Sequence, residues 1–197
     1  MSNEMSNPGR RQFLTAATSA VAGVGVVGIA VPFIGSWNPS AKAKAAGAPV
    51  KFDPSKMEPG QLVRVEWRGQ PVFVIRRTQE QLDDLVTIND SLKDPQSLIS
   101  KQPTYVDEIN RAVKSEFLVL VGLCTHLGCS PKYIKKLDSA APDAAWKGGF
   151  FCACHGSKFD MAGRVYKGVP ASENLVVPPY NYESGSLMVI GVDGDTA

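Results

Sequence analysis

A single uncharged stretch stands out in the distribution of polar and apolar positions along the chain. No charged residue occurs from Gln12 to Ala41, and the 24 residues from Phe13 to Ser36 are almost all apolar or small. As a helix they extend about 36 Å at about 1.5 Å per residue, enough to cross a bilayer core of about 30 Å. The pattern predicts a transmembrane anchor over residues 13–37 that contacts membrane lipids. Residues 38–50, rich in small side chains, are expected to form a flexible linker.

Patterns of short strands fill much of the remaining chain. Residues 61–68 alternate between apolar and polar positions, residues 69 and 70 are expected to form a turn, and residues 71–77 continue as an apolar strand. Residues 117–123 form an apolar run that is typical of a buried strand. Further short strands are expected at residues 148–151, 164–167, 174–177 and 186–192. These patterns predict a mainly β, antiparallel domain over residues 51–197.

One helix is expected inside this domain. Thr78 and Gln81 form a capping pair ahead of Leu82, Leu85 and Val86, which recur at helical spacing. Residues 90–116 are polar and interrupted by proline, so we expect a loop there with room for a short helix.

Composition and charge narrow the class of protein. With 197 residues, of which 44% are hydrophobic and 20% charged, the chain has the composition of a globular protein. A net charge of +2 gives no strong electrostatic footprint for nucleic acid, so we expect no nucleic-acid partner.

Two arginines precede the apolar stretch. Residues 10–14 read Arg-Arg-Gln-Phe-Leu, which resembles a twin-arginine export signal, with a simple positive flank of a membrane helix as the alternative. Export by that route indicates that residues 1–12 are a cytoplasmic leader. The small residues around Lys42 and Lys44 also fit a cleavage site, but the apolar run is longer than a typical signal core. We therefore favour an uncleaved anchor.

All four cysteines and both histidines of the chain lie in two short segments. Residues 124–129 read Cys-Thr-His-Leu-Gly-Cys, residues 152–157 read Cys-Ala-Cys-His-Gly-Ser, and each follows an expected strand. Thiolates and imidazoles are borderline-soft ligands, and Gly128 and Gly156 allow the backbone to turn tightly around a bulky centre. The two segments therefore predict a metal site. Zinc bound by two cysteines and two histidines is the nearest alternative, although it leaves two cysteines unexplained.

The two segments resemble the paired boxes C-T-H-x-G-C and C-P-C-H-G-S of Rieske iron–sulfur proteins. Nearly the full chain resembles the Rieske subunits of bacterial cytochrome bc complexes, from the arginine-headed anchor through residues 67–73 to residues 174–180. This resemblance implies an antiparallel Rieske-type β domain with a small cluster-binding part over about residues 118–170, preceded by one N-terminal transmembrane helix. It also implies one [2Fe–2S] cluster, with Cys124 and Cys152 on one iron and His126 and His155 on the other.

The resemblance extends to residues around the cluster. It implies a disulfide between Cys129 and Cys154, which agrees with an oxidising compartment. Ser157 matches a family serine whose hydroxyl bonds a cluster sulfur, and residues 168–171 resemble the proline-containing loop that covers the cluster. Phe159 stands where many high-potential members have a tyrosine, and a phenyl ring cannot donate that hydrogen bond.

The same resemblance implies a function within quinol–cytochrome c reductase, an oxidoreductase that contributes to proton translocation. The chain is expected to take one electron from quinol at a site shared with cytochrome b, with His155 receiving a proton, and to pass the electron to the haem of a c-type cytochrome. The head is expected in the periplasm, on a single-pass anchor in the inner membrane, with residues 38–50 as a hinge. A Rieske subunit of another exported membrane oxidoreductase and a zinc-binding structural domain are the alternatives.

Overall fold

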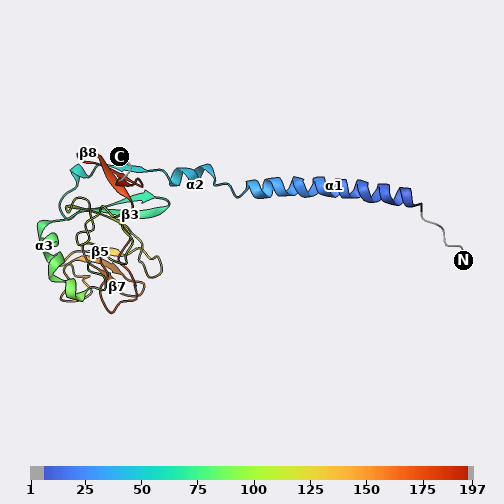
Figure 1. Ribbon diagram of the computed structural model, residues 1–197. Helices are drawn as coiled ribbons and strands as arrows, with labels where there is room; N and C mark the ends of the chain where they lie inside the picture. The colour runs from blue at the N-terminus through green and yellow to red at the C-terminus, as the bar shows by residue number, and fades with distance from the viewer. Residues whose placement is uncertain (1–6, 195–197) are drawn as a thin grey trace. The chain divides into compact units, whose positions relative to one another are not determined.

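The computed structural model of the chain describes residues 7–194, in two compact units that divide between residues 45 and 46. The N-terminal unit contains one long helix, α1, which spans Pro8–Gly35 (Figure 1). Asn7 caps this helix by accepting a hydrogen bond of 3.1 Å from the Gly9 backbone N–H, and Pro8 follows at a position where proline is favoured. By length and composition α1 can cross a membrane. The helix thus starts within the predicted leader, of which residues 1–6 lie outside the described part.

The linker is partly ordered in the structure. A short helix, α2, spans Ala41–Ala46, in agreement with the strong helix propensity of alternating alanine and lysine. Val50, the last residue of the predicted linker, already begins the first strand, β1 (Val50–Phe52). The segment predicted to be flexible over residues 38–50 therefore includes a helix of six residues and ends in a sheet.

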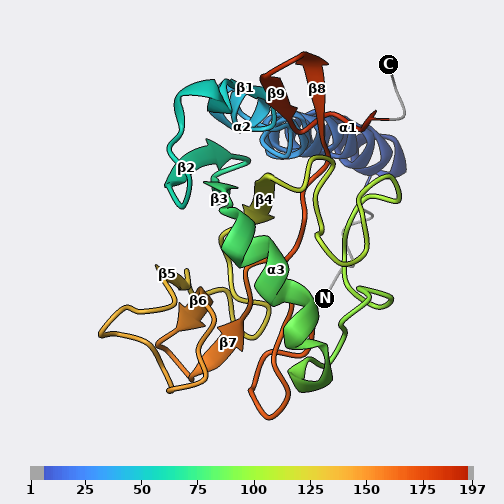
Figure 2. The same cartoon turned by 90° about the vertical axis from the view of Figure 1, so that its left-hand side faces the viewer.

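Three antiparallel sheets of three strands each build the second unit, which confirms the mainly β prediction. In sheet order they are β1, β9 (Leu187–Ile190) and β8 (Tyr180–Ser184); β2 (Leu62–Trp67), β3 (Gln70–Arg76) and β4 (Phe117–Val121); and β5 (Lys132–Ile134), β6 (Gly149–Cys152) and β7 (Ser157–Phe159). The β2–β3–β4 sheet lies between the other two, and the β5–β6–β7 sheet lies at the end away from β8 (Figure 1, Figure 2).

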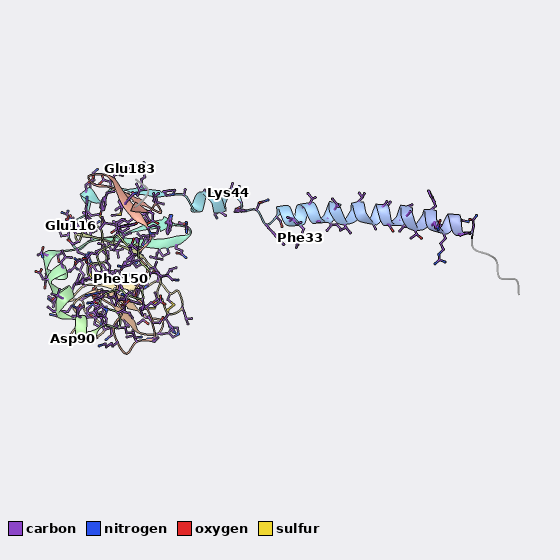
Figure 3. The ribbon with its side chains drawn as sticks, in the orientation of Figure 1. Phe33, Lys44, Asp90, Glu116, Phe150 and Glu183 are labelled. Atoms are coloured by element: carbon purple, nitrogen blue, oxygen red, sulfur yellow. A yellow bond between two sulfur atoms is a disulfide. The ribbon has the colours of Figure 1, made fainter. Side chains whose placement is uncertain are left out.

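The central sheet carries much of the core. Residues 72–75 of β3 are fully buried, which explains why this strand reads as a continuous apolar run. The β2–β3 turn lies one residue earlier than predicted, because Gln70 pairs with Trp67. Its central residues are Arg68 and Gly69, with φ of 53° and 69°, the left-handed geometry that a two-residue hairpin requires. Phe73 of β3 stacks on Phe150 of β6, labelled in Figure 3, with ring centroids 5.8 Å apart, so the central sheet supports the β5–β6–β7 sheet.

The predicted helix forms as α3 (Gln79–Thr87), and Thr78 and Gln81 make the reciprocal hydrogen bonds of a capping box. Leu85 is buried, whereas Val86 is 62% exposed and lies outside the apolar face. Two short 3₁₀ turns span Pro54–Lys56 and Asn89–Ser91, and residues 92–116 contain no helix or extended strand, as predicted for this loop.

The strands predicted at residues 164–167 and 174–177 do not form. Val165 and Tyr166 make only isolated bridges, and side chains satisfy much of the backbone in this segment. The fully buried carboxylate of Asp160 accepts hydrogen bonds from the backbone of residues 162 and 164 and from the Arg164 guanidinium. The buried Asn174 side chain accepts a hydrogen bond of 2.8 Å from the Val165 N–H. These polar partners take the place of strand neighbours.

Candidate metal centre

The two cysteine–histidine segments form matching turns at neighbouring places in the fold. Residues 124–129 follow β4, and residues 153–156 connect β6 to β7, where Cys152 pairs with Ser157. The Gly128 N–H donates to the Cys124 carbonyl at 2.9 Å, and the Gly156 N–H donates to the Cys152 carbonyl at the same distance. Both glycines have φ near +78° (79° and 77°), a conformation that favours glycine. Each loop is therefore a closed turn with one cysteine at its base.

The structure brings the predicted ligands together in pairs. Cys124 and Cys152 carry free thiols that are each only 3% exposed, and the two thiols lie within hydrogen-bonding reach of each other. The rings of His126 and His155 meet edge to face with centroids 4.8 Å apart. His126 is half-buried and His155 is exposed. The site thus has a buried sulfur side and a histidine side that reaches the surface.

The buried thiols fit a cationic centre. Burial raises the pKa of the Cys124 thiol, and the adjacent Cys152 raises it further, while the His126 backbone N–H and the Ser157 hydroxyl act in the opposite direction. Two thiolates this deeply buried are costly unless a cation offsets their charge. Iron held by the two thiolates would provide that charge, so the donor set and its burial fit a centre with cysteine and histidine ligands.

The remaining two cysteines form the predicted disulfide, which is confirmed. Cys129 and Cys154 join the two loops covalently. The sulfurs of Cys129, Cys152 and Cys154 lie within 4.8 Å of one another. Two of them belong to the disulfide, so only Cys152 in this group of three can bind a metal as a thiolate. The disulfide therefore lies directly beside the Cys152 thiol.

A third segment closes the site from the side of residues 168–174. The fully buried Ser157 hydroxyl accepts a hydrogen bond of 3.0 Å from the Ala171 N–H. Thr125, which lies between Cys124 and His126, donates a hydrogen bond of 2.6 Å to the Glu173 carbonyl. Sequence reasoning did not identify the contact of Thr125, and its position between two predicted ligands was the only signal for it.

Comparison with known proteins identifies the family of the globular unit. The family model described as Rieske [2Fe-2S] domain matches residues 49–181. A second model, described as Ubiquitinol-cytochrome C reductase Fe-S subunit TAT signal, matches residues 1–40. The globular unit is therefore a Rieske domain whose cofactor is a [2Fe–2S] cluster, and the predicted twin-arginine signal is confirmed. The zinc alternative is thereby excluded.

Relatives along the full length define the family further. The chain is 49% identical to the ubiquinol-cytochrome c reductase iron-sulfur subunit of Allochromatium vinosum, covering 100% of this chain and 95% of that protein. Identity is 42% with the subunit of the same name from Bradyrhizobium diazoefficiens (94% and 96% covered) and 41% with that from Blastochloris viridis (96% and 97% covered). The chain belongs to the family of ubiquinol–cytochrome c reductase iron–sulfur subunits, part of an oxidoreductase complex. The export signal and helix α1 fit a membrane-anchored Rieske subunit.

Phe159 gives a first prediction. Its ring is fully buried on the same face of β7 as Ser157, because the two residues are two positions apart in the strand. Ser157 pairs with Cys152 across the β6–β7 ladder, so a tyrosine at position 159 carries its hydroxyl on the strand face that meets a predicted ligand, and a hydrogen bond to a ligand sulfur stabilises the reduced form. We expect Phe159→Tyr to raise the midpoint potential in a redox titration. Phe151→Tyr, on the opposite face of β6, serves as the control, and an unchanged potential in Phe159→Tyr would contradict the assigned geometry.

Proposed function

We propose that this chain is the electron-carrying subunit of a quinol–cytochrome c reductase. It accepts one electron from quinol at a site shared with cytochrome b and passes it to the haem of a c-type cytochrome. The observation that carries this proposal is the exposed His155 ring in contact with His126, on two loops that each begin at a buried thiol. The bound cluster supplies a one-electron couple at about −150 to +300 mV, because two neutral imidazoles replace two thiolates.

The four side chains have separate roles in this proposal. Cys124 and Cys152 bind one iron, which their burial shields from water, and His126 and His155 bind the other iron at the surface. The burial of the thiols and the meeting of the imidazoles support this division. The family relationship supports the same division, since the match to the Rieske [2Fe-2S] domain model spans both loops.

His155 is the residue that meets the quinol. Because its ring is exposed, the ring nitrogen that would not bind iron can accept a hydrogen bond from the quinol hydroxyl and receive its proton. Leu127, 71% exposed on the other loop, provides an apolar contact for the surface of cytochrome b. Proton release from quinol at this face contributes to proton translocation by the complex.

The N-terminal part places the head on one side of the membrane. Residues 1–12 form the cytoplasmic leader, residues 13–37 the anchor in the bacterial inner membrane, and residues 51–197 the periplasmic head. The twin-arginine signal and the disulfide support this orientation, since disulfides persist in the periplasm. Residues 38–50 are the hinge over which the head moves between quinol and haem.

Purification from native membranes tests this function. We expect the affinity-tagged chain to purify with a b-type and a c-type cytochrome, and added quinol to reduce the cluster and the c-type haem together. Electron paramagnetic resonance follows the cluster, and visible absorption follows the haems. Purification with a different oxidoreductase, and without a b-type cytochrome, would favour the alternative Rieske subunit.

A further inference from the structure

A lysine outside the two ligand loops holds the segment that closes the site. The Lys93 ammonium donates hydrogen bonds of 2.8 Å to the Val169 carbonyl and 2.6 Å to the Ala171 carbonyl. These two carbonyls flank Pro170, which has no N–H of its own. Hydrogen bonds from a charged donor are stronger than neutral ones, so a single side chain fixes both sides of the proline.

The backbone around Lys93 is fixed against the same segment. The Lys93 N–H donates to the Val165 carbonyl at 2.9 Å, and the Lys167 N–H donates to the Ser91 carbonyl at 2.8 Å. Beyond the loop, the Asn174 side chain donates to the Asp94 carbonyl at 2.9 Å. Hydrogen bonds on both sides of loop 168–171 therefore fix the backbone of residue 93 relative to the loop.

A hydrogen bond connects the loop to Ser157, on the sulfur side of the site. Ala171 is fully buried, and its N–H donates to the Ser157 hydroxyl oxygen at 3.0 Å. Ser157 pairs with Cys152 across the β6–β7 ladder, and its hydroxyl lowers the pKa of the Cys124 thiol, so it lies on the sulfur side of the site. Since the serine oxygen accepts a hydrogen bond from the Ala171 N–H, the hydrogen of the hydroxyl is left to donate to another acceptor on the sulfur side of the site.

We propose that Lys93 is a positioning residue for the redox centre. It holds loop 168–171 so that Ala171 orients the Ser157 hydroxyl toward the sulfur side of the site, where a hydrogen bond from that hydroxyl to a sulfur stabilises the more negative, reduced state. The proposal rests on the proposed role of Cys124 as an iron ligand. It assigns a function to a surface lysine that belongs to neither ligand loop.

Redox titration of the full chain in its membrane complex tests the proposal. We expect Lys93→Met to lower the midpoint potential and to change the electron paramagnetic resonance spectrum of the cluster. Lys93→Arg can still donate to both carbonyls, so its midpoint potential and its spectrum should stay close to those of the wild type. Lys135→Met removes one exposed lysine next to β5 as a control for charge, and it should leave both unchanged.

A double-mutant cycle separates a contact through Ser157 from a simple effect of charge. If Lys93 acts through Ser157, Lys93→Met lowers the potential in the wild-type background and has no further effect in Ser157→Ala. An equal shift in both backgrounds would overturn the proposal, as would an unchanged potential in Lys93→Met when Ser157→Ala lowers it. A separate variant tests whether Cys124 is an iron ligand. A Rieske spectrum that survives in Cys124→Ala would contradict that role.

Discussion

Substitution of His155 by alanine is expected to abolish assembly of the cluster, and not merely to slow turnover. The variant keeps one imidazole and two thiols, so on the proposed assignment one iron would lack a protein ligand on the exposed side of the site. Water reaches that corner directly, and an incompletely ligated iron is released. Visible absorption and electron paramagnetic resonance of the purified chain should both lack the Rieske signal.

Two further variants complete this experiment. His126→Ala should give the same loss, because its ring lies 4.8 Å from that of His155 and is assigned to the same iron. Leu137→Ala, at a side chain 95% exposed, should keep the full signal and controls for export and folding. A Rieske spectrum retained in His155→Ala would refute the ligand role of this residue, and with it the proposed contact with quinol.

The ligand loops could be predicted from the sequence because each is a local structure. In both, one cysteine and one glycine four residues later close the turn, and the histidine lies between them. Helix α3 was predictable for the same reason, since its capping box involves residues three positions apart. Local patterns of this kind do not depend on the rest of the fold.

The segment from residue 157 to residue 177 shows where prediction from the sequence fails. Its backbone partners are distant or polar, such as the Asn174 side chain and the carboxylate of Asp160, and an apolar pattern does not reveal them. Strands β5 and β7 have three residues each, too few to show an alternation. The Lys93 contacts span 76 and 78 residues, so they could be found only from the structure.

Removal of the disulfide is expected to have the second largest effect. The Cys129–Cys154 bond closes a loop of 25 residues, and loop-closure entropy for that length corresponds to about 3.5 kcal/mol of stability. Replacing both cysteines with alanine, which leaves no unpaired thiol, should lower the free energy of unfolding by about this amount. Denaturant unfolding of the purified chain measures it, and wild-type protein treated with a reductant should show a similar loss.

The same double variant should also lose its cluster faster, because the disulfide lies beside the Cys152 sulfur and fixes the distance between the loops. Decay of the visible spectrum during storage measures this loss. The Cys124 N–H also donates a hydrogen bond of 2.8 Å to the Cys129 carbonyl. This bond joins the two ends of the first loop and does not connect it to the second loop. If stability and cluster lifetime both equal the wild-type values, core packing and the iron ligands alone must hold the loops together.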